Sequence, residues 1–258
     1  MVSVDQRAVI DDSAILADGV KIGPYSVIGA DVSIGNNTVI GPHVVIHGPT
    51  RIGANNRIFQ FSSVGEDPQD KKYAQERTEL EIGDHNVIRE FCTINRGTVQ
   101  DHGITSIGSH NLLMAYTHIA HDCKLGSHVV MSNGASLAGH VELGDHVVLG
   151  GFSLVHQFTH IGQYCFAAMG SAISQDVPSY VMVAGNPTKP HSINIVGLER
   201  HGFTSEVINE IRRAYKIIYK SGLKLGDAIA VLSEMSHETK EIECMVDFLR
   251  KSNRGIIR

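Results

Sequence analysis

Aliphatic residues recur at every sixth position along much of the chain, with polar residues and glycines between them. The first run is Ile10, Leu16, Ile22, Ile28, Ile34, Ile40, Ile46, Ile52, Ile58 and Val64. The spacing returns from Ile82 to Ile94, and a third run extends from Ile107 to Ile173. A period of six fits neither the 3.6-residue turn of a helix nor the two-residue alternation of a long strand. It predicts a solenoid in which every hexad supplies one short strand and one turn.

Hexads of this kind resemble those of the hexapeptide-repeat proteins. The likeness implies a left-handed parallel β-helix with three hexads in each triangular coil, an exception to the right-handed rule for parallel crossovers. Stacked coils then place residues i and i+18 one above the other, at the ~4.8 Å separation of hydrogen-bonded strands. Glycine often follows the aliphatic residue, as in Ile22-Gly23 and Ile52-Gly53, where it tolerates a sharp corner.

Two polar segments, 66–80 and 96–106, interrupt the hexads. We expect both to leave a corner of the solenoid as loops, and long loops on a rigid scaffold commonly carry function. The repeat fades after Ile173, so we expect a β-helix domain over residues 1–190 and an α-helical domain over residues 191–258. The helices expected there run from an N-cap at Thr204 to about Gly222, over Asp227–Met235 and over Glu238–Lys251.

Composition narrows the choice of partners and compartment. The net charge of −5 argues against nucleic acid as a partner. No apolar run reaches ~18 residues, so no membrane insertion is expected. Residues Met1–Ile10 lack the apolar stretch of a secretion signal. The four cysteines show neither CxxC spacing nor a disulfide pattern, which favours a reducing, cytoplasmic environment.

Histidine is abundant, at 15 residues, and several histidines share one slot of the repeat. Six histidines lie three residues after a hexad aliphatic, namely His43, His85, His110, His128, His140 and His146. A repeated slot indicates a turn preference, so most of these are expected to be solvated corner residues. Between Ile88 and Leu137, larger side chains mostly replace the glycine after the aliphatic residue. This zone lies beside both loops, and we expect the functional site there.

The 18-residue rule brings chemically useful groups together in this zone. It places His121, Gly139 and Gln157 in one column, with Asp122 below His140 in the next column. An imidazole with an ordinary pKa of ~6.5 serves as a general base near neutral pH. A glycine N–H beside it stabilises a developing oxyanion. The arrangement therefore indicates acyl transfer.

Longer motifs make the likeness more specific. They are His118-Ile-Ala-His121-Asp122-Cys123, Leu137-Ala-Gly139-His140-Val141, Val155-His156-Gln157-Phe158, Gln69-Asp70-Lys-Lys72-Tyr73, Arg96-Gly97-Thr98-Val99-Gln100 and Arg254-Gly255-Ile256-Ile257-Arg258. Together they resemble the UDP-N-acetylglucosamine acyltransferase family, which acts at the start of lipid A synthesis. The likeness extends over the whole chain, whereas the hexads alone would identify only a superfamily.

The resemblance implies transfer of a 3-hydroxyacyl chain from acyl carrier protein to the 3-hydroxyl of UDP-N-acetylglucosamine. It implies a homotrimer with sites between subunits and no metal or organic cofactor. His121 would be the general base, Asp122 would orient it, and the Gly139 N–H would stabilise the oxyanion. The implied substrate-binding residues are Gln69, Asp70, Lys72, His118, His140, His156, Gln157, Asn194 and Arg200.

Four positions depart from the family pattern or vary within it. Asn95 stands where the family commonly has histidine, Val196 replaces an acidic residue, and His201 replaces a basic one. Asn95 leaves open a sugar that carries a 3-amino group. Met169 stands where some relatives have glycine beside the acyl tail, and its bulk is expected to shorten the accepted chain.

Other interpretations stay open on the sequence. A zinc site at His118, His121 and His140 is the competing chemistry, although their spacing matches no dedicated ligand pattern. The related N-acyltransferase of the same pathway carries an extra N-terminal domain, for which the early start of the hexads leaves no room. A purely structural solenoid should have uniform faces, unlike this one.

A basic surface is needed to receive the anionic carrier protein. The candidates are on the first long helix expected near the C-terminus, namely Arg212, Arg213, Lys216 and Lys220. A solvated helix face is an equally good interpretation of these four residues.

Overall fold

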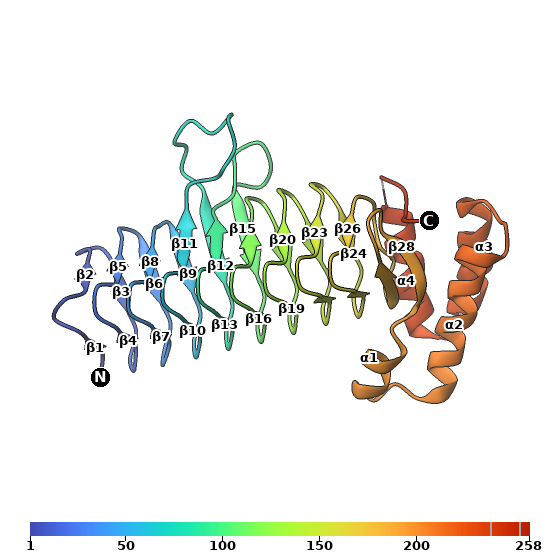
Figure 1. Ribbon diagram of the computed structural model, residues 1–258, viewed down its shortest axis with the longest axis horizontal. Coiled ribbons are helices and arrows are strands. Elements are labelled where there is room, and N and C mark those ends of the chain that lie inside the picture. Colours follow the sequence, from blue (N-terminus) through green and yellow to red (C-terminus); the bar gives the residue numbers. More distant parts are fainter. Residues whose placement is uncertain (238, 253) are drawn as a thin grey trace.

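The computed structural model describes residues 1–237, 239–252 and 254–258. The chain winds into a long triangular prism of stacked coils, and its C-terminal helices gather at one end (Figure 1). Up to Ile173, successive strands enter three sheets in strict rotation, so each coil has three corners. We call the turn from the first to the second sheet the first corner, that from the second to the third sheet the second corner, and the remaining turn the third corner.

The three sheets are built almost entirely of two- to four-residue strands. The first sheet contains β1 (Ser3–Val4), β4 (Lys21–Ile22), β7 (Val39–Ile40), β10 (Arg57–Ile58), β13 (Val87–Ile88), β16 (Leu112–Leu113), β19 (Val130–Met131), β22 (Val148–Leu149), β25 (Phe166–Ala167), β27 (Val181–Ala184) and β28 (Lys189–Ile193). The second contains β2 (Val9–Ile10), β5 (Val27–Ile28), β8 (Val45–Ile46), β11 (Ser63–Glu66), β14 (Thr93–Asn95), β17 (His118–Ile119), β20 (Ser136–Leu137), β23 (Leu154–Val155) and β26 (Ala172–Ile173). The third contains β3 (Ile15–Leu16), β6 (Val32–Ile34), β9 (Thr50–Ile52), β12 (Glu79–Ile82), β15 (Ile104–Ile107), β18 (Lys124–Leu125), β21 (Glu142–Leu143) and β24 (His160–Ile161).

Up to Ile173, strand register follows the 18-residue rule wherever no loop intervenes, whereas β27 departs from it because Phe166 pairs with Met182. Ser136 pairs with His118 below it and with Leu154 above it, in parallel. The hexad aliphatics from Ile22 to Ile173 are buried along the prism axis, whereas Ile10 and Leu16 in the first coil are partly buried. Burial of one aliphatic side chain per hexad fixes the register, because a one-residue slip would expose it. The predicted left-handed parallel β-helix is confirmed.

The corner positions carry backbone that few side chains adopt. All six histidines of the repeated slot, with φ between 55° and 62°, lie in the left-handed region. Histidine, asparagine and aspartate tolerate this region better than most residues. The predicted turn preference therefore has a backbone cause. His43, His85, His110 and His128 are exposed, whereas His140 and His146 are partly buried.

Both loops leave the prism at the second corner (Figure 1). The first occupies residues 67–78 between β11 and β12, and the second occupies residues 96–103 between β14 and β15. The coils resume their register after each insertion, since Arg51 pairs with Glu81 and Thr93 pairs with His118. The insertions therefore add chain to one corner without disturbing the stack.

The C-terminal part contains α1 (Ile195–Arg200), α2 (Ser205–Lys220), α3 (Leu225–Ser236) and α4 (Lys240–Lys251). The Thr204 side chain accepts a hydrogen bond from the Val207 N–H and caps α2, as predicted. Of the third predicted helix, Glu238 lies outside the described residues. The sequence did not predict α1 or the antiparallel pairing of β27 with β28. The division into two domains at residue 190 stays a prediction.

Candidate functional site

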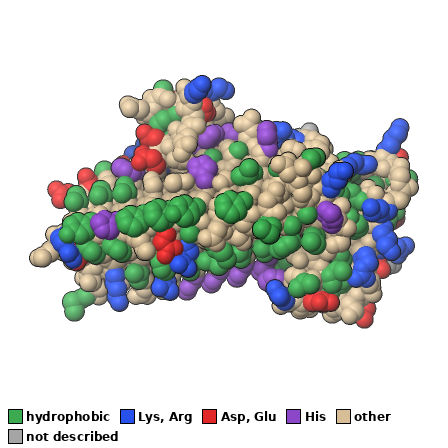
Figure 2. Space-filling model, in the orientation of Figure 1, with side chains coloured by type: hydrophobic (Ala, Val, Ile, Leu, Met, Phe, Trp, Pro, Cys, Tyr) green, Lys and Arg blue, Asp and Glu red, His purple; other side chains and the backbone are tan. Residues whose placement is uncertain are grey.

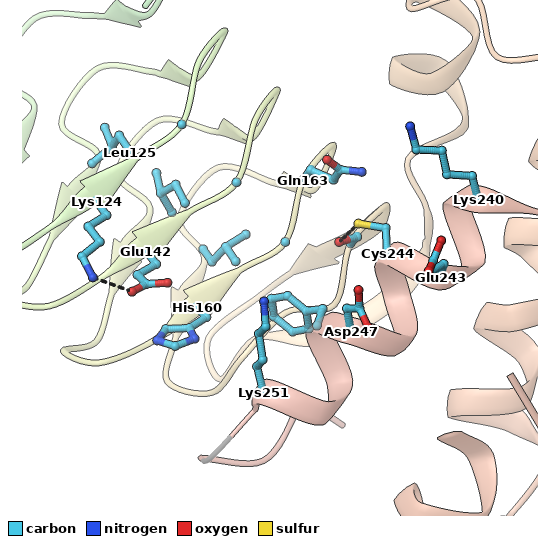
Figure 3. A pocket seen from close by; sticks show the side chains of 17 residues that line it. Lys124, Leu125, Glu142, His160, Gln163, Lys240, Glu243, Cys244, Asp247 and Lys251 are labelled. Atoms are coloured by element: carbon cyan, nitrogen blue, oxygen red, sulfur yellow. Dashed lines mark hydrogen bonds and ion pairs between the residues drawn. The ribbon is translucent and has the colours of Figure 1, made fainter. Parts of the chain in front are cut away.

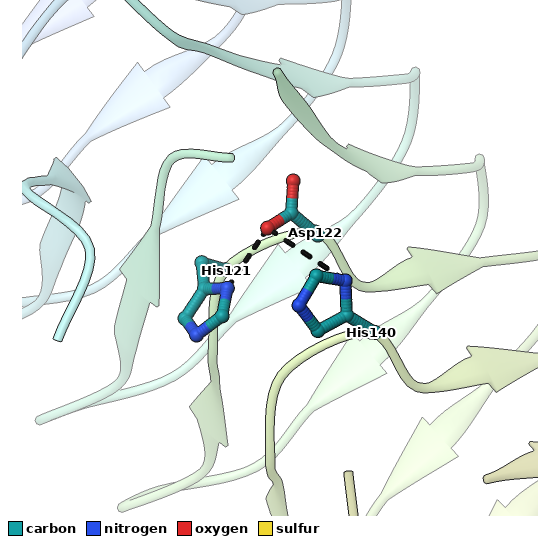
Figure 4. Close-up of side chains that lie close together, drawn as sticks. All are labelled: His121, Asp122 and His140. Carbon is teal, nitrogen blue, oxygen red and sulfur yellow. Dashed lines mark hydrogen bonds and ion pairs between the residues drawn. The ribbon is translucent and has the colours of Figure 1, made fainter. Parts of the chain in front are cut away.

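The second corner holds a histidine–aspartate pair between β17 and β18. His121 Nδ1 lies 2.8 Å from Asp122 Oδ2 (Figure 4). The Asp122 side chain is 1 % exposed and that of His121 is 13 % exposed. A carboxylate accepts hydrogen bonds only, so the hydrogen of the neutral imidazole lies on Nδ1 and its Nε2 carries a lone pair. His121 can therefore accept a proton at Nε2.

Gly139 lies directly beside the His121 ring, in the coil above. A Cβ atom at residue 139 would be 2.6 Å from His121 Cε1 and 2.8 Å from Nε2. No side chain fits there while the ring keeps its place. Among the described residues, the Gly139 N–H has no hydrogen-bond acceptor. A donor of this kind next to a proton acceptor is what a tetrahedral acyl-transfer intermediate needs.

The second loop holds the Asp122 carboxylate in place. The Thr98 N–H donates to Asp122 Oδ1 at 2.8 Å, and the Thr98 hydroxyl donates to Oδ2 at 2.7 Å. Burial alone would raise the pKa of Asp122, but the hydrogen bonds from His121 and Thr98 outweigh it, and the pKa lies below its ordinary value. Asp122 is therefore ionised at neutral pH.

His140 belongs to the same cluster but has a different main partner. Its Nδ1 lies 2.9 Å from Asp101 Oδ2 and 3.9 Å from Asp122 Oδ2. Its ring stacks on Phe158, with 4.3 Å between centroids, and stands at 88° to the ring of His121. The two imidazoles therefore share one corner with separate carboxylates.

His118 lies on β17 beside this corner and bonds outside the pair. Its Nδ1 lies 2.7 Å from the Thr93 hydroxyl on β14. Burial, and secondly the nearby His121, lower the pKa of His118. The side chains with metal-ligating atoms within 4.8 Å of one another are instead His121, Asp122 and His140. Among the described residues, the three histidines of the zinc interpretation therefore do not form one such group.

Cys123 follows the pair directly in the sequence, and its thiol is inert. Its thiol is fully buried and donates to the Ala138 carbonyl at 3.2 Å. Burial raises the pKa of Cys123 to about 12. A neutral, enclosed thiol does not attack a thioester, so this corner is suited to direct transfer rather than to an acyl-cysteine intermediate.

The structure does not join the first loop to the histidine pair. Gln69 and Lys72 are exposed on that loop, and the Lys72 N–H donates to Asp70 Oδ1 at 3.0 Å. Within residues 1–237, 239–252 and 254–258, no hydrogen bond or ion pair connects these three residues with His121.

Further candidates lie on coils above the pair, and all are exposed. His156 and Gln157 follow β23, and His156 Nδ1 lies 3.1 Å from the Gln157 carbonyl. Met169, at 80 % exposure, lies at the first corner between β25 and β26. The His121 column thus continues through Gly139 to Gln157, while Met169 lies at a different corner.

Asn194 and Arg200 line a separate pocket of about 410 Å³ on the outer face of the first sheet. Asn194 caps α1, because its Oδ1 accepts from the Gly197 N–H while its Nδ2 donates to the Tyr164 carbonyl. Val196 lines the same pocket. His201 packs edge-on against His146 at the third corner. Within one chain, the residues predicted to bind the nucleotide therefore lie on the first sheet, whereas His121 lies at the corner between the second and third sheets.

Asn95 is buried beside the base of the loops rather than open to a ligand. Its Nδ2 donates to the Asp67 carbonyl at 2.8 Å, and the residue is 2 % exposed. Its neighbour Arg96 is paired with Asp67 and also bonds to the Gly65 carbonyl. Asn95 thus anchors the first loop to the prism.

A larger hollow, of about 600 Å³, lies between the third sheet and α4 (Figure 3). Lys124 and Glu142 form an ion pair at 3.3 Å on its sheet side, and Cys244 lies on its helix side. None of the residues predicted for the site lines it. The largest hollows and the hydrogen-bonded histidine cluster of the second corner therefore lie in different places.

Sequence reasoning missed the residues that buttress the pair. Thr98 and Asp101 come from the second loop, and Thr93 comes from the coil below. The 18-residue rule cannot place loop residues, because an insertion has no fixed register. The one signal in the sequence was the position of the loop at the candidate corner.

Among the described helices, none combines the length and apolar character that crossing a membrane requires.

Two family models match parts of the chain. Residues 104–139 match the bacterial transferase hexapeptide model of six repeats, and residues 176–257 match the second domain of UDP N-acetylglucosamine O-acyltransferase. The first match covers the coils that hold the histidine pair. The second covers the unpredicted β27–β28 pair and the helices.

Full-length relatives agree with these matches. An acyl-[acyl-carrier-protein]–UDP-N-acetylglucosamine O-acyltransferase of Pseudomonas putida (strain KT2440) is 55% identical over 258 residues, covering 100% of both chains. The solved structure of LpxA from Acinetobacter baumannii has a TM-score of 0.97 and 51% identity, covering 99% of each chain. UDP-N-acetylglucosamine O-acyltransferase (LpxA) from Moraxella catarrhalis gives 0.98 and 47%, again covering 99% of each chain. The chain with its histidine–aspartate corner therefore belongs to the UDP-N-acetylglucosamine O-acyltransferase family.

Proposed function

We propose that this protein transfers a 3-hydroxyacyl chain from acyl carrier protein to the 3-hydroxyl of UDP-N-acetylglucosamine in the cytoplasm, as an early step of lipid A synthesis. The names of its full-length relatives support the two substrates. The free thiols of all four cysteines support the compartment. The observation that carries the proposal is the His121–Asp122 dyad, with the Gly139 N–H beside its ring.

The reaction proceeds by direct attack on the thioester. His121 Nε2 takes the proton of the sugar 3-hydroxyl while that oxygen bonds to the thioester carbon. The Gly139 N–H donates to the oxyanion of the tetrahedral intermediate. The intermediate collapses, the carbon–sulfur bond breaks, and the carrier thiolate takes the proton back from the His121 imidazolium. The buried Asp122 carboxylate holds the ring and stabilises its charged form between these two transfers.

Substrate binding divides between two regions of the molecule. His118, His140, His156 and Gln157 hold the sugar near the second corner, and Gln69 and Asp70 contact it from the first loop. Lys72 supplies a positive charge to the diphosphate. Asn194 and Arg200 hold the uridine in the pocket on the first sheet. Met169 limits the acyl length, and the basic face of α2, comprising Arg212, Arg213, Lys216 and Lys220, receives the carrier.

Separate half-sites require more than one chain, and we propose a homotrimer. The part of the site around His121 borders the second sheet, and the pocket proposed for uridine lies on the first sheet. These two sheets meet at the first corner. That corner carries a column of stacked rings at 4.9–5.3 Å spacing, comprising Tyr25, His43, Phe61, Phe91 and Tyr116. Tyr116 is 62 % exposed. Hydrophobic side chains form a stripe along the prism in Figure 2, as expected of a surface that subunits cover.

The test replaces the proposed base. With carrier-linked 3-hydroxyacyl groups and UDP-N-acetylglucosamine, His121→Ala should lower turnover by about 10²- to 10⁴-fold. Melting temperature and oligomeric state should stay unchanged, because the backbone of the coil does not depend on this ring. His128→Ala, at an exposed third-corner position, is the matched control and should keep full activity. Wild-type-like turnover by His121→Ala would refute the mechanism.

A second assay tests whether the acyl chain is transferred to a 3-hydroxyl oxygen or to a 3-amino nitrogen of the sugar. The same enzyme is offered the nucleotide sugar with a 3-amino group in place of the hydroxyl. Preference for the 3-hydroxyl sugar supports ester formation. Preference for the amine would replace the proposed acceptor and retain the role of His121.

A further inference from the structure

The second loop brings a carboxylate to His140 that belongs to neither the repeat nor the His121 dyad. Asp101 Oδ2 lies 2.9 Å from His140 Nδ1, and Asp101 Oδ1 lies 3.2 Å from His102 Nε2. The His140 side chain is 13 % exposed and that of Asp101 is 30 % exposed. Stacking on Phe158 fixes the ring plane of His140, and Asp101 then determines which nitrogen of that plane carries the hydrogen.

Two imidazoles face the same Asp122 oxygen in this corner (Figure 4). His121 Nδ1 is 2.8 Å from Asp122 Oδ2, and His140 Nδ1 is 3.9 Å from it. The first distance is a hydrogen bond and the second is too long for one. Asp101 supplies the closer acceptor for His140, so His140 does not compete with His121 for Asp122.

The Asp101 contact also sets the tautomer of His140. A carboxylate only accepts, so the neutral ring carries its hydrogen on Nδ1. Nε2, on the other side of the ring, then presents a lone pair away from the loop. Loss of Asp101 would leave Asp122 Oδ2, at 3.9 Å, as the remaining carboxylate oxygen near Nδ1 and would allow hydrogen on either nitrogen.

We propose that Asp101 is a positioning residue that keeps His140 in the Nδ1–H tautomer and reserves Asp122 for His121. The kinetic consequence rests on the proposed acyl transfer, whereas the tautomer and the hydrogen bond stand without it. The second loop is then part of the site, because Thr98 holds the Asp122 carboxylate of the His121 pair and Asp101 holds His140.

The first test reads the tautomer directly. Nitrogen-15 chemical shifts of the histidine rings, recorded at a pH where His140 is neutral, should show His140 with hydrogen on Nδ1 in the wild type. Asp101→Ala should move the signals toward a mixture of tautomers, whereas Asp101→Asn keeps an acceptor oxygen and should preserve the Nδ1–H form. His102→Ala is the control and should leave His140 unchanged. Unaltered His140 shifts in Asp101→Ala would overturn the proposal.

The second test is a double-mutant cycle on kcat/KM. Asp101→Ala should lower kcat/KM by about 10- to 100-fold, the range expected for losing a hydrogen bond to a charged group. In the His140→Ala background the same substitution should change it by less than about 2-fold, because its target is gone. Equal losses in both backgrounds would show that Asp101 does not act through His140.

The tests separate this inference from the proposed function. If His121→Ala stays active, the mechanism fails while the tautomer result still decides the role of Asp101. Melting temperatures of the Asp101 variants should match the wild type, because the residue lies on a partly exposed loop. Asp101→Asn should retain most of the activity, and its loss together with preserved shifts would count against the positioning role.

Discussion

At the scale of single residues, the missing side chain of Gly139 leaves room for the His121 ring. A Cβ at this position would be 2.6 Å from the His121 ring, so Gly139→Ala must push the imidazole away from its present place. The ring is the end of a side chain and can move, so the free energy of unfolding should change little. Turnover should fall by about 10²-fold, because small misplacements of a catalytic group cost that much.

The control for Gly139 is Gly151, which takes the equivalent position before the corner residue at the first corner. A Cβ there would meet the Asn133 carbonyl at 3.4 Å, an ordinary contact. Gly151→Ala should therefore keep both activity and melting temperature. Steady-state turnover and thermal melts of the two variants test whether Gly139 is needed for acyl transfer. Wild-type turnover by Gly139→Ala would show that it is not.

At the scale of elements, the third corner carries a ladder of four stacked histidines. The centroids of His85, His110, His128 and His146 are 4.7–4.9 Å apart. Burial, then His201 and His128, lower the pKa of His146. Its Nδ1 is buried without a hydrogen-bond partner among the described residues. A proton on this ring is therefore unfavourable in the folded state.

The sign of the resulting pH effect follows from linkage. The unfolded chain binds a proton at this histidine near pH ~6.5, above the folded pKa, so stability falls as the pH drops through that value. His146→Tyr, which repeats the tyrosine found at Tyr164 in the same column, should flatten the decline of melting temperature between about pH 7.5 and pH 5.5. The gain at the acid end should be on the order of 1–2 °C.

The matched control for the ladder is His43→Tyr. His43 stacks between Tyr25 and Phe61 rather than on other histidines. Thermal melts across the pH range compare both variants with the wild type. An identical acid decline for His146→Tyr and the wild type would mean that the ladder does not govern this part of the stability curve.

Elements whose apolar residues recur at a regular spacing could be predicted from the sequence, and elements without such a spacing could not. The spacing of Ile107 to Ile173 determines the strands because each aliphatic must point to the axis. The 18-residue rule also placed Gly139 at the His121 ring. The Asp101 and Thr98 contacts could not be predicted, because the fold of loop 96–103 depends on what it packs against. The pairing of β27 with β28 could not be predicted, because both strands follow the last hexad and their register shifts between Met182 and Val183.

At the scale of the whole molecule, the proposed homotrimer with shared sites predicts how two different defective chains behave when they assemble together. His121 lies at the second corner, and Arg200 lines the pocket on the first sheet. If each site takes His121 from one subunit and Arg200 from the next, chains that lack one or the other complement each other. Co-expression of His121→Ala and Arg200→Ala chains with different affinity tags, followed by tandem purification, isolates the mixed trimers.

Cyclic symmetry then sets the expected activity. Every mixed trimer contains one junction at which a chain with intact His121 precedes a chain with intact Arg200, whichever variant is present twice. One site in three is complete, so activity should be about one third of the wild-type value. Mixed trimers of His121→Ala and Asp122→Ala chains should stay inactive, because the dyad lies within one chain. Equal inactivity of both mixtures would mean that each chain builds its own site. The aromatic column of the first corner would then not border a site shared between subunits.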